Sequence, residues 1–446
     1  MTVDLPHGWS LLTLGEICRR SGGFIQTGPF GSQLHASDYT TLGVPVVMPV
    51  NIGENRIVED GIARVPKGEA ARLQRHKLRP GNVVYSRRGD IGRRALISDA
   101  EDGWLCGTGC LRIDFGAGVL DSKFATYHLS NPDTRNWIVR HAVGTTMPNL
   151  NTAILSAIPF VVPSLHEQIK IGEVLGCLDG KIELNRRVNH TLESIAGLVF
   201  CSWFVDFDPV TAKAKGRQPP GISPDAAAMF PSRFRESQIG PVPEGWSVQP
   251  IGELLELNPL RQLKQGLVAP YLEMANVSKS QARVVAWENR PFSSGMRFRN
   301  GDVLLARITP CLEHGKTAYV DFLDHDQIGW GSTEYIVLRS KVPLPTEYAY
   351  FLARSEGFRA HAITNMTGSS GRQRVSASSL ADFPVVCPPV NITREFGTVA
   401  KAALAKMKSN DEESASLAAL RDALIPKLMS GELRVRDAEK QVGEHV

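Results

Sequence analysis

The feature that most constrains the fold of this chain is an internal duplication that covers much of its sequence. Residues 5–17 read LPHGWSLLTLGEI and residues 242–254 read VPEGWSVQPIGEL, so that Pro, Gly, Trp, Ser, Gly and Glu match at one constant spacing. Two further pairs keep the same order: VVMPVNI (46–52) with YLEMANV (271–277), and GNVVYSR (81–87) with GDVLLAR (301–307). Solenoid repeats span only ~20 to 50 residues. Each copy is therefore a whole domain, and we expect a pseudo-two-fold relation between the two.

The front part of each copy has the pattern of short strands followed by a helix. Runs such as VVYS, RALIS and CLRIDF alternate apolar with polar residues and are broken by Gly, Pro or Asn, which is typical of strands. Large apolar residues then recur every three or four positions over residues 122–142 and again over 346–363, which predicts one helix in each segment. The front part of each copy is therefore expected to mix α and β structure.

The back part of each copy predicts one long helix. Apolar residues and asparagines recur there at alternating steps of four and three, which is the a/d pattern of a coiled coil. In the first copy, expected to be helical over about 166–204, the pattern is carried by Ile171, Leu175, Leu178, Ile182, Asn185, Asn189, Leu192 and Val199. In the second copy it is carried by Phe396, Ala403, Met407, Leu417 and Leu424. We expect the two helices to pack together, with the asparagines fixing the register, and Pro426 to kink or end the second helix. The alternative is that each is a core helix of its own domain.

Composition narrows the class of protein without fixing it. A net charge of +4, from 50 basic and 46 acidic residues, is too mild to indicate nucleic-acid binding by itself. The seven cysteines are scattered and have no metal-ligand spacing, which indicates reduced thiols and no metal site. No apolar run approaches the ~20 residues that a membrane span needs. We therefore expect a cytoplasmic protein that does not enter a membrane.

Motifs for catalysis are incomplete wherever they begin. The string PCLEHGKT at 310–317 imitates a phosphate-binding loop, but Pro310 stands where the first glycine is required. GTGCLR at 107–112 lacks the last glycine of a dinucleotide fingerprint. Nothing in the sequence provides the flipped-base loop of an amino-methyltransferase. We therefore expect no catalytic residue in this chain.

The residues that recur between the copies are suited to DNA. Arginine can read guanine and asparagine or glutamine can read adenine, while hydroxyl groups and lysine anchor phosphates. The same residue types also serve ordinary turns. The candidates in the first copy are Thr27, Ser32, Gln33, Asn51, Arg87, Arg88, Thr145, Thr146, Asn149 and Asn151. Those in the second copy are Asn276, Arg307, Lys316, Ser369, Ser370, Arg372, Gln373 and Arg374.

Taken together, the chain resembles the specificity subunit of type I restriction-modification systems over nearly its whole length. The paired openings LPHGWSLLTLGEI and VPEGWSVQPIGEL, the element TGPFGSQLHASDY (27–39), the region 179–209 and the segment ALIPKLMSGELRV (423–435) carry the resemblance. The second copy departs from the pattern, because it reads NPLRQLKQG (258–266) where TGPFGS is expected. This departure is expected if the two copies recognise different bases.

The resemblance implies an α+β fold of two pseudo-symmetric mixed α/β target recognition domains, separated by two long helices that form an antiparallel coiled coil. The expected boundaries are a first recognition domain at 1–163, a central spacer helix region at 164–207, a Pro-rich linker at 208–241, a second recognition domain at 242–390, a C-terminal spacer helix region at 391–435 and a flexible tail at 436–446.

The resemblance also implies partners. Each recognition domain would read one half of a bipartite target in double-stranded DNA, with a fixed gap between the halves. Two modification subunits, which bind S-adenosylmethionine, would dock on the spacer helices, where Leu198, Phe200, Trp203 and Phe204 are expected to face partner helices. Restriction subunits would use ATP and Mg²⁺, and this chain itself would hold no cofactor. The competing functions are a stand-alone nuclease or fused enzyme, which catalytic motifs would reveal, and a structural coiled-coil scaffold, which would not bind DNA.

Overall fold

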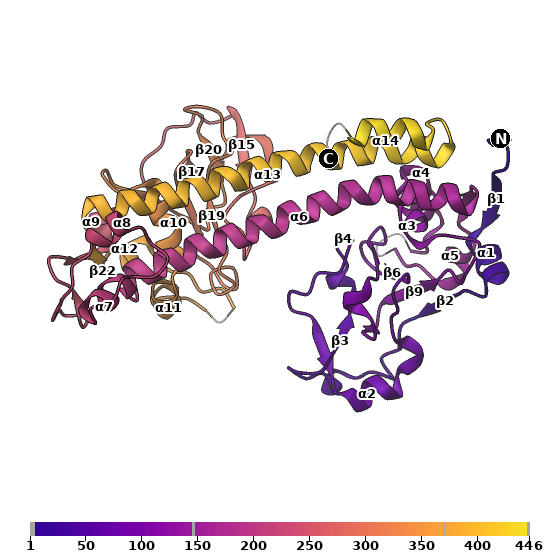
Figure 1. Cartoon of the computed structure of the whole chain (residues 1–446), viewed down its shortest axis with the longest axis horizontal. Helices are drawn as coiled ribbons and strands as arrows, with labels where there is room; N and C mark the ends of the chain where they lie inside the picture. The colour runs from indigo at the N-terminus through magenta and orange to yellow at the C-terminus, as the bar shows by residue number, and fades with distance from the viewer. Residues whose placement is uncertain (1–4, 145–147, 370, 444–446) are drawn as a thin grey trace. The chain divides into compact units, whose positions relative to one another are not determined.

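A computed structural model describes residues 5–144, 148–369 and 371–443. The chain divides into two compact units. The first unit is Met1–Glu183 together with Ser414–Val446, and the second is Leu184–Glu413. Both contain sheets and helices, so the fold class is α+β as predicted (Figure 1).

The first unit begins with a strand and alternates short strands and helices up to the front part of a long helix. The end of a second long helix and one short helix complete it. Its strands are β1 (Ser10–Thr13), β2 (Phe24–Thr27), β3 (Val44–Val47), β4 (Glu54–Asn55), β5 (Ala63–Val65), β6 (Val83–Ser86), β7 (Arg94–Leu96), β8 (Leu105–Cys106), β9 (Cys110–Asp114) and β10 (Pro159–Val162). Its helices are α1 (Leu14–Ser21), α2 (Lys67–Arg72), α3 (Ser122–Ser130), α4 (Pro132–His141), α5 (Thr152–Ser156), the front part of α6 (Leu165–Phe204), the end of α13 (Val390–Ser430) and α14 (Val435–Gly443).

The second unit repeats this order after a short insertion. Its strands are β11 (Phe234–Arg235), β12 (Val242–Pro243), β13 (Ser247–Pro250), β14 (Leu255–Leu257), β15 (Val268–Leu272), β16 (Glu288–Pro291), β17 (Met296–Phe298), β18 (Val303–Ala306), β19 (Thr317–Tyr319), β20 (Gly329–Gly331), β21 (Tyr335–Ser340) and β22 (Pro384–Cys387). Its helices are the rest of α6, α7 (Asp208–Ala214), α8 (Pro224–Ala228), α9 (Ile251–Leu254), α10 (Thr346–Arg354), α11 (Glu356–Thr364), α12 (Ala377–Ala381) and most of α13.

The duplication seen in the sequence recurs in the sheets. The order β2-β9-β6-β7 in the first unit matches β14-β21-β18-β19 in the second, and β5-β3-β8 matches β16-β15-β20. In the sets β5-β3-β8 and β16-β15-β20 the middle strand pairs antiparallel on one side and parallel on the other. The antiparallel pairs β1-β10 and β13-β22 also correspond. The two units therefore share one topology.

One predicted helix in each copy is broken at the same place. The segment 122–142 forms α3 and α4, separated by Asn131, and 346–363 forms α10 and α11, separated by Ser355. Both residues have an extended backbone, with ψ of 130° and 145°. Pro132 explains the first break, since proline disfavours a helical conformation in the residue before it.

The two long helices are confirmed. Asn185 contacts Asn410 and Glu413, whereas Asn189 contacts Met407 and Asp411. From Asn185 to Asn189 the chain advances along α6, while the contacted residues on α13 move back from Asn410 and Glu413 to Met407 and Asp411. The two helices are therefore antiparallel (Figure 1).

The seam residues predicted from the heptad pattern lie in or against the apolar cores of the two units. Those of the first unit are Ile171, Leu175, Leu178, Ile182, Leu417 and Leu424. Those of the second unit are Leu192, Val199, Phe396, Ala403 and Met407.

Of the two outcomes expected at Pro426, a kink or an end of the helix, the second is wrong. Helix α13 continues through it to Ser430. A proline inside a helix costs about 3 kcal/mol, but Ile425, Leu428 and Met429 are buried around it. Each such side chain contributes roughly 1.5–3 kcal/mol when it leaves water, so packing outweighs the lost hydrogen bond.

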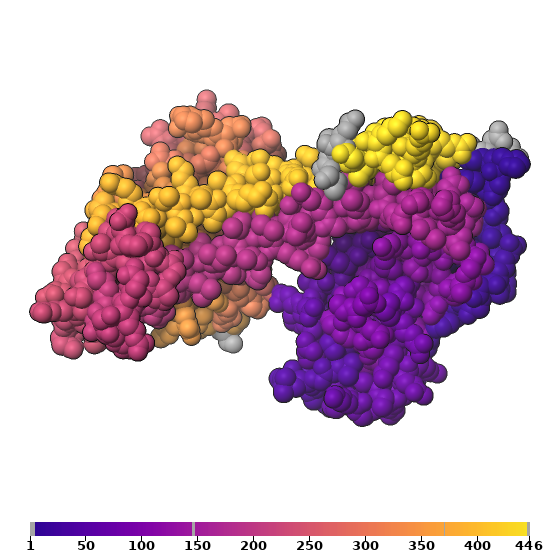
Figure 2. Space-filling model, in the orientation of Figure 1, coloured from indigo at the N-terminus to yellow at the C-terminus, as the bar shows by residue number. Residues whose placement is uncertain are grey.

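Two segments have more structure than the sequence indicated. The Pro-rich stretch 208–241 holds α7, α8 and β11, and its Val210 and Phe230 are buried in the second unit. Within the expected flexible tail, the structure instead has α14, whose Ala438 and Val442 join the core of the first unit. Figure 2 shows α14, in yellow, lying on the front part of α6. Apolar residues spaced by four explain why this segment packs as a helix.

No single helix among the described residues has the length and apolar composition to cross a membrane, and one bent pair, α6 followed by α7, meets that test by length and composition alone.

Candidate nucleic-acid interface

An arginine follows the corresponding strand in each unit and is held by the same backbone contacts. Arg87 comes directly after β6, and its N–H donates to the carbonyl of Gly109 at 2.8 Å. Arg307 comes directly after β18, and its N–H donates to the carbonyl of Glu334 at 2.9 Å. The two arginines are thus equivalent in the fold.

A loop from later in the chain docks on each arginine. The N–H of Leu150 donates to the carbonyl of Arg87, and the N–H of Val375 donates to the carbonyl of Arg307, both at 2.9 Å. The loops are closed by paired backbone hydrogen bonds, between Val143 and Asn149 in the first unit and between Thr367 and Arg374 in the second. We call this arrangement the arginine–loop frame: Arg87 with Val143, Asn149 and Leu150, and Arg307 with Thr367, Arg374 and Val375.

The two frames carry different side chains on the same backbone. The residue whose carbonyl accepts the N–H of the arginine is Gly109 in the first unit and Glu334 in the second. The loop residue that forms a β-bridge with the residue after the arginine is Asn149 in the first unit and Arg374 in the second.

The second frame contains an ion pair that the sequence analysis missed. Nε and Nη2 of Arg374 donate to the carboxylate of Glu334 at 2.5–3.0 Å. These hydrogen bonds, with further attraction from Arg307 and Arg372, lower the pKa of Glu334. Glu334 is 40 positions from Arg374, so no local pattern joins them. The duplication could have pointed to Glu334, because it places Glu334 at the position in the second unit that Gly109 has in the first.

The arginines themselves present a buried donor. Nε of Arg87 and Nε of Arg307 are both buried and have no hydrogen-bond partner in the part of the chain that the structure describes. A buried donor without a partner is costly. The same holds for Nε of Arg112, Arg261 and Arg359, so this feature is shared by the two frames but is not confined to them.

The TGPFGS element lies against the first frame. Gly28, Pro29, Phe30 and Gly31 line a hollow of about 190 Å³ together with Arg87, Arg88, Thr108, Gly109 and Cys110. Thr27 ends β2 directly before this hollow, and Ser32 is exposed beside it. Gln33 accepts the N–H of Phe30 with its side chain at 3.2 Å. The structure therefore brings the motif and the arginines together, as a shared recognition surface requires.

Several other candidates have their side chains occupied within the fold. Asn51 is 1% exposed, accepts from Met48 and donates to the carbonyl of Val58. Asn151 caps α5 by accepting the N–H of Ile154 at 2.8 Å.

In the second unit, the ammonium of Lys316 donates to the carbonyl of Met274 at 2.7 Å. Asn276, the counterpart of Asn51 at the end of a 3-10 turn, is exposed. Turn and cap roles thus account for Asn51 and Asn151, whereas Asn276 remains accessible.

The remaining candidates that the structure describes lie in the loop of the second unit or directly after Arg87. Ser369 and Arg372 are exposed, and the carbonyl of Gln373 accepts from Thr309 at 3.0 Å. Arg88 is exposed and pairs through its backbone with Asn149. Thr145, Thr146 and Ser370 lie outside the described residues.

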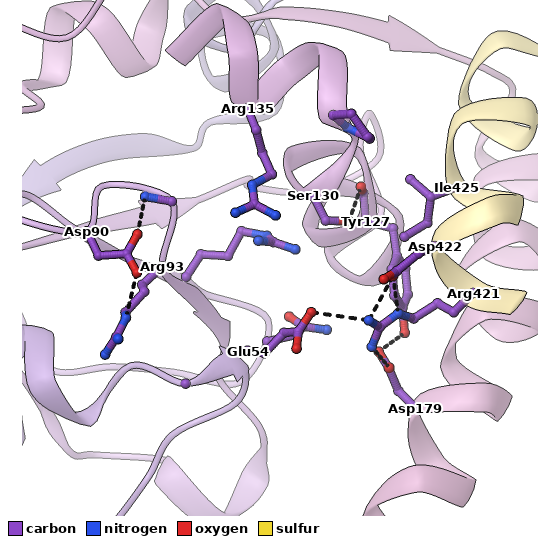
Figure 3. A pocket seen from close by; sticks show the side chains of 15 residues that line it. Glu54, Asp90, Arg93, Tyr127, Ser130, Arg135, Asp179, Arg421, Asp422 and Ile425 are labelled. Atoms are coloured by element: carbon purple, nitrogen blue, oxygen red, sulfur yellow. Dashed lines mark hydrogen bonds and ion pairs between the residues drawn. The ribbon is translucent and has the colours of Figure 1, made fainter. Parts of the chain in front are cut away.

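A separate cleft of about 560 Å³ lies in the first unit (Figure 3). Arg421 of α13 forms ion pairs there with Asp179 at 2.6 Å, Asp422 at 2.8 Å and Glu54 at 3.2 Å. Burial opposes the charge of Arg421, but these carboxylates raise its pKa overall. Figure 3 also shows Arg135 pointing into the cleft. Arg421 thus links α13 both to α6, through Asp179, and to strand β4, through Glu54.

The outer side of α6 differs from our expectation. Phe200, Trp203 and Phe204 were expected to face partner helices, but they are buried in the aromatic core of the second unit around Phe396. Leu198 alone of the four is exposed. It belongs to a set of exposed apolar residues, three on α6 and one directly after its end, spaced by eleven, three and seven positions, which keeps the three helical residues near one side of the helix. We call this set the outer stripe: Leu184, Ile195, Leu198 and Val205.

Within the described residues, no group of three or more His, Cys, Asp or Glu side chains is arranged to hold a metal ion. The seven cysteines are all free thiols.

Comparison with known proteins gives a consistent result. The family model described as "Type I restriction modification DNA specificity domain" matches residues 6–194. The type I restriction enzyme HindI specificity subunit of Haemophilus influenzae is 24% identical, over 87% of this chain and 95% of the relative. The MjaIX specificity subunit of Methanocaldococcus jannaschii is 21% identical, over 97% of this chain and 95% of the relative. Both alignments cover nearly the whole length of the two relatives.

The fold agrees with a solved structure. The S subunit of a type I restriction-modification system from M. genitalium superposes with a TM-score of 0.51 at 17% sequence identity, covering 96% of this chain and 97% of that one. At this identity the likeness concerns the fold.

Proposed function

Since the chain belongs to the family of type I restriction-modification specificity subunits, we propose that it reads a DNA target in two parts, one with each unit. The arginine–loop frame of each unit would face the bases of one half-site. Phosphate contacts from nearby hydroxyl and basic groups would fix its position on the duplex.

The observation that carries this proposal is the repeated frame with different side chains. A scaffold that only holds partners has no need of equivalent arginines held by the same backbone hydrogen bonds in both units. Two readers of different sequences need one backbone and unlike side chains at the contact positions, because the donors and acceptors in the major groove identify the base pair. Asn149 and Arg374 stand at equivalent positions and present unlike donors and acceptors.

The helix pair would serve two further roles. We propose that α6 and α13 set the distance between the units, and hence the gap between the half-sites. Modification subunits, two for each chain, would dock on the spacer helices, and the outer stripe supplies apolar surface for the contact. Exposed apolar patches of this kind are typical of interaction sites.

Chemistry would reside in the partners. S-adenosylmethionine would bind to the modification subunits, and ATP with Mg²⁺ to the restriction subunits. This chain would hold no cofactor and catalyse no step. Purified alone, it should transfer no methyl group and hydrolyse no ATP, and robust activity of either kind would favour the competing enzyme.

The test is to produce the chain with its modification subunits and to map adenine methylation across a genome. We expect one motif with two defined parts and a fixed gap. Arg87→Ala should relax one part and Arg307→Ala the other. Lys170→Ala, which removes one charge of an exposed ion pair with Glu173, is the matched control and should leave the motif intact. Methylation without a bipartite motif, or two variants that relax the same part, would contradict the proposal.

A further inference from the structure

Arg374 and Glu334 form a fork with one free edge. The carboxylate takes Nε and Nη2, which is the side edge of the guanidinium. The end edge, formed by Nη1 and the second proton of Nη2, has no hydrogen-bond partner in the described part of the chain. Both side chains remain partly accessible, at 34% for Arg374 and 22% for Glu334.

An arginine fixed in this way suits one base. The end edge of a guanidinium carries two parallel N–H donors, and guanine presents two acceptors, O6 and N7, in the major groove. A carboxylate behind the arginine holds its plane, so less rotamer entropy is lost on binding. From this geometry we propose that Arg374, positioned by Glu334, reads one guanine in the half-site of the second unit.

The pair differs from an ordinary surface ion pair. Arg72 and Glu69, for comparison, are neighbours on one turn of α2. Arg374 instead lies on the docked loop, and Glu334 lies directly before β21 with its carbonyl accepting the N–H of Arg307, so the pair joins the two parts of the frame. Arg307 and Arg372 add positive charge around the same carboxylate. The surplus of arginines draws the negatively charged duplex to this frame.

The first unit lacks this device. At the equivalent positions it has Gly109, which has no side chain, and Asn149. The inference is therefore specific to the half-site of the second unit, and it rests on the proposed function.

The experiment selects bound sequences from random DNA with the assembled complex of this chain and its modification subunits. Wild type is compared with Arg374→Ala, Arg374→Lys and Glu334→Gln, and Lys170→Ala is the control. We expect the wild-type motif to hold a G·C pair whose preference falls roughly 5- to 100-fold in Arg374→Ala, while every other position is retained. Arg374→Lys should also lose it, because lysine keeps the charge but not the fork. Glu334→Gln should weaken the preference at the same position only.

Three outcomes would overturn the inference. Uniform weakening at all positions in Arg374→Ala identifies a phosphate contact. An unchanged motif in Arg374→Ala excludes a base contact, and the thermal unfolding of each variant shows whether it is folded. If wild type selects no bipartite motif, the proposed function fails and the inference falls with it, whereas the first two outcomes leave the proposed function standing.

Discussion

Asn410 donates from its side-chain amide to the side-chain oxygen of Asn189 at 2.8 Å, across the buried seam between α13 and α6. Asn189 in turn donates to Asp411 at 2.7 Å. A polar pair in an apolar seam is satisfied in only one register, so this contact selects the alignment of the two helices.

Asn189→Ala should lower the free energy of unfolding by about 1–3 kcal/mol, because it removes the acceptor of Asn410 and the donor to Asp411. Urea denaturation measures the change. Thr191→Ala, at an exposed position on the same helix, should stay within about 0.5 kcal/mol. Replacing both asparagines with leucine should recover much of the loss. An equal loss in the Thr191 variant would show that the seam is not special.

His128 should make the first unit sensitive to acid. Burial lowers the pKa of His128 to about 3, and its ring stacks on Phe160 with centroids 4.1 Å apart. The unfolded chain binds a proton near pH 6.5 and the folded chain does not. Stability is therefore lost as the pH falls from about 6.5 toward 3, by up to about 1.4 kcal/mol per pH unit.

The measurement is urea denaturation between pH 7 and pH 5. His128→Phe should be less stable at pH 7, since Val161 loses the acceptor of its N–H, but its stability should fall less steeply with pH. His325→Gln, at a highly exposed position, should keep the wild-type slope. Identical slopes in all three proteins would refute the assignment to His128.

Ile195→Glu with Leu198→Glu should prevent co-purification with the modification subunit, because two charges would enter an apolar contact. Both residues are at least half exposed, so the free energy of unfolding of the isolated chain should change little. Leu42→Glu, at an exposed apolar site in the first unit, controls for added charge. Normal assembly of the double variant would rule out the outer stripe as the docking surface.

Seven residues inserted into each helix, after Glu183 and after Glu413, should lengthen the gap in the target. These positions are the boundaries of the two units, so the contacts inside each unit are kept. Seven helical residues add about 10 Å, which is roughly three base pairs. Methylation mapping reads the gap directly, and a gap of unchanged length would disprove the role of the helices in spacing.

The sequence was sufficient for features that are repeated or periodic. The duplication predicted two units of one topology, and the heptad pattern predicted α6 and α13, because both signals are carried by many residues. The break at Asn131 has a local signal in Pro132, whereas the helix through Pro426 depends on packing between distant segments, which no local pattern contains.

The candidate site contains residues of both kinds: those that a repeated pattern reveals and those whose contacts form only when the chain folds. Arg87 and Arg307 could be found because they follow matching strands. The amide of Asn51 turned inward to close a turn, and residue type alone cannot separate that use from base contact. Glu334 was missed because its link to Arg374 exists only after the loop has docked.

The division of the chain into units has a consequence for its synthesis. The second unit is one continuous stretch, 184–413, whereas the first needs residues 414–446 as well as 1–183. On the ribosome, the first unit cannot be completed until residues 414–446 have been translated, which happens after the whole second unit. Only then can Leu417, Leu424 and α14 cover the core of the first unit. The later-made unit can thus mature earlier, and the early-made unit spends that interval with an apolar face exposed to chaperones and proteases.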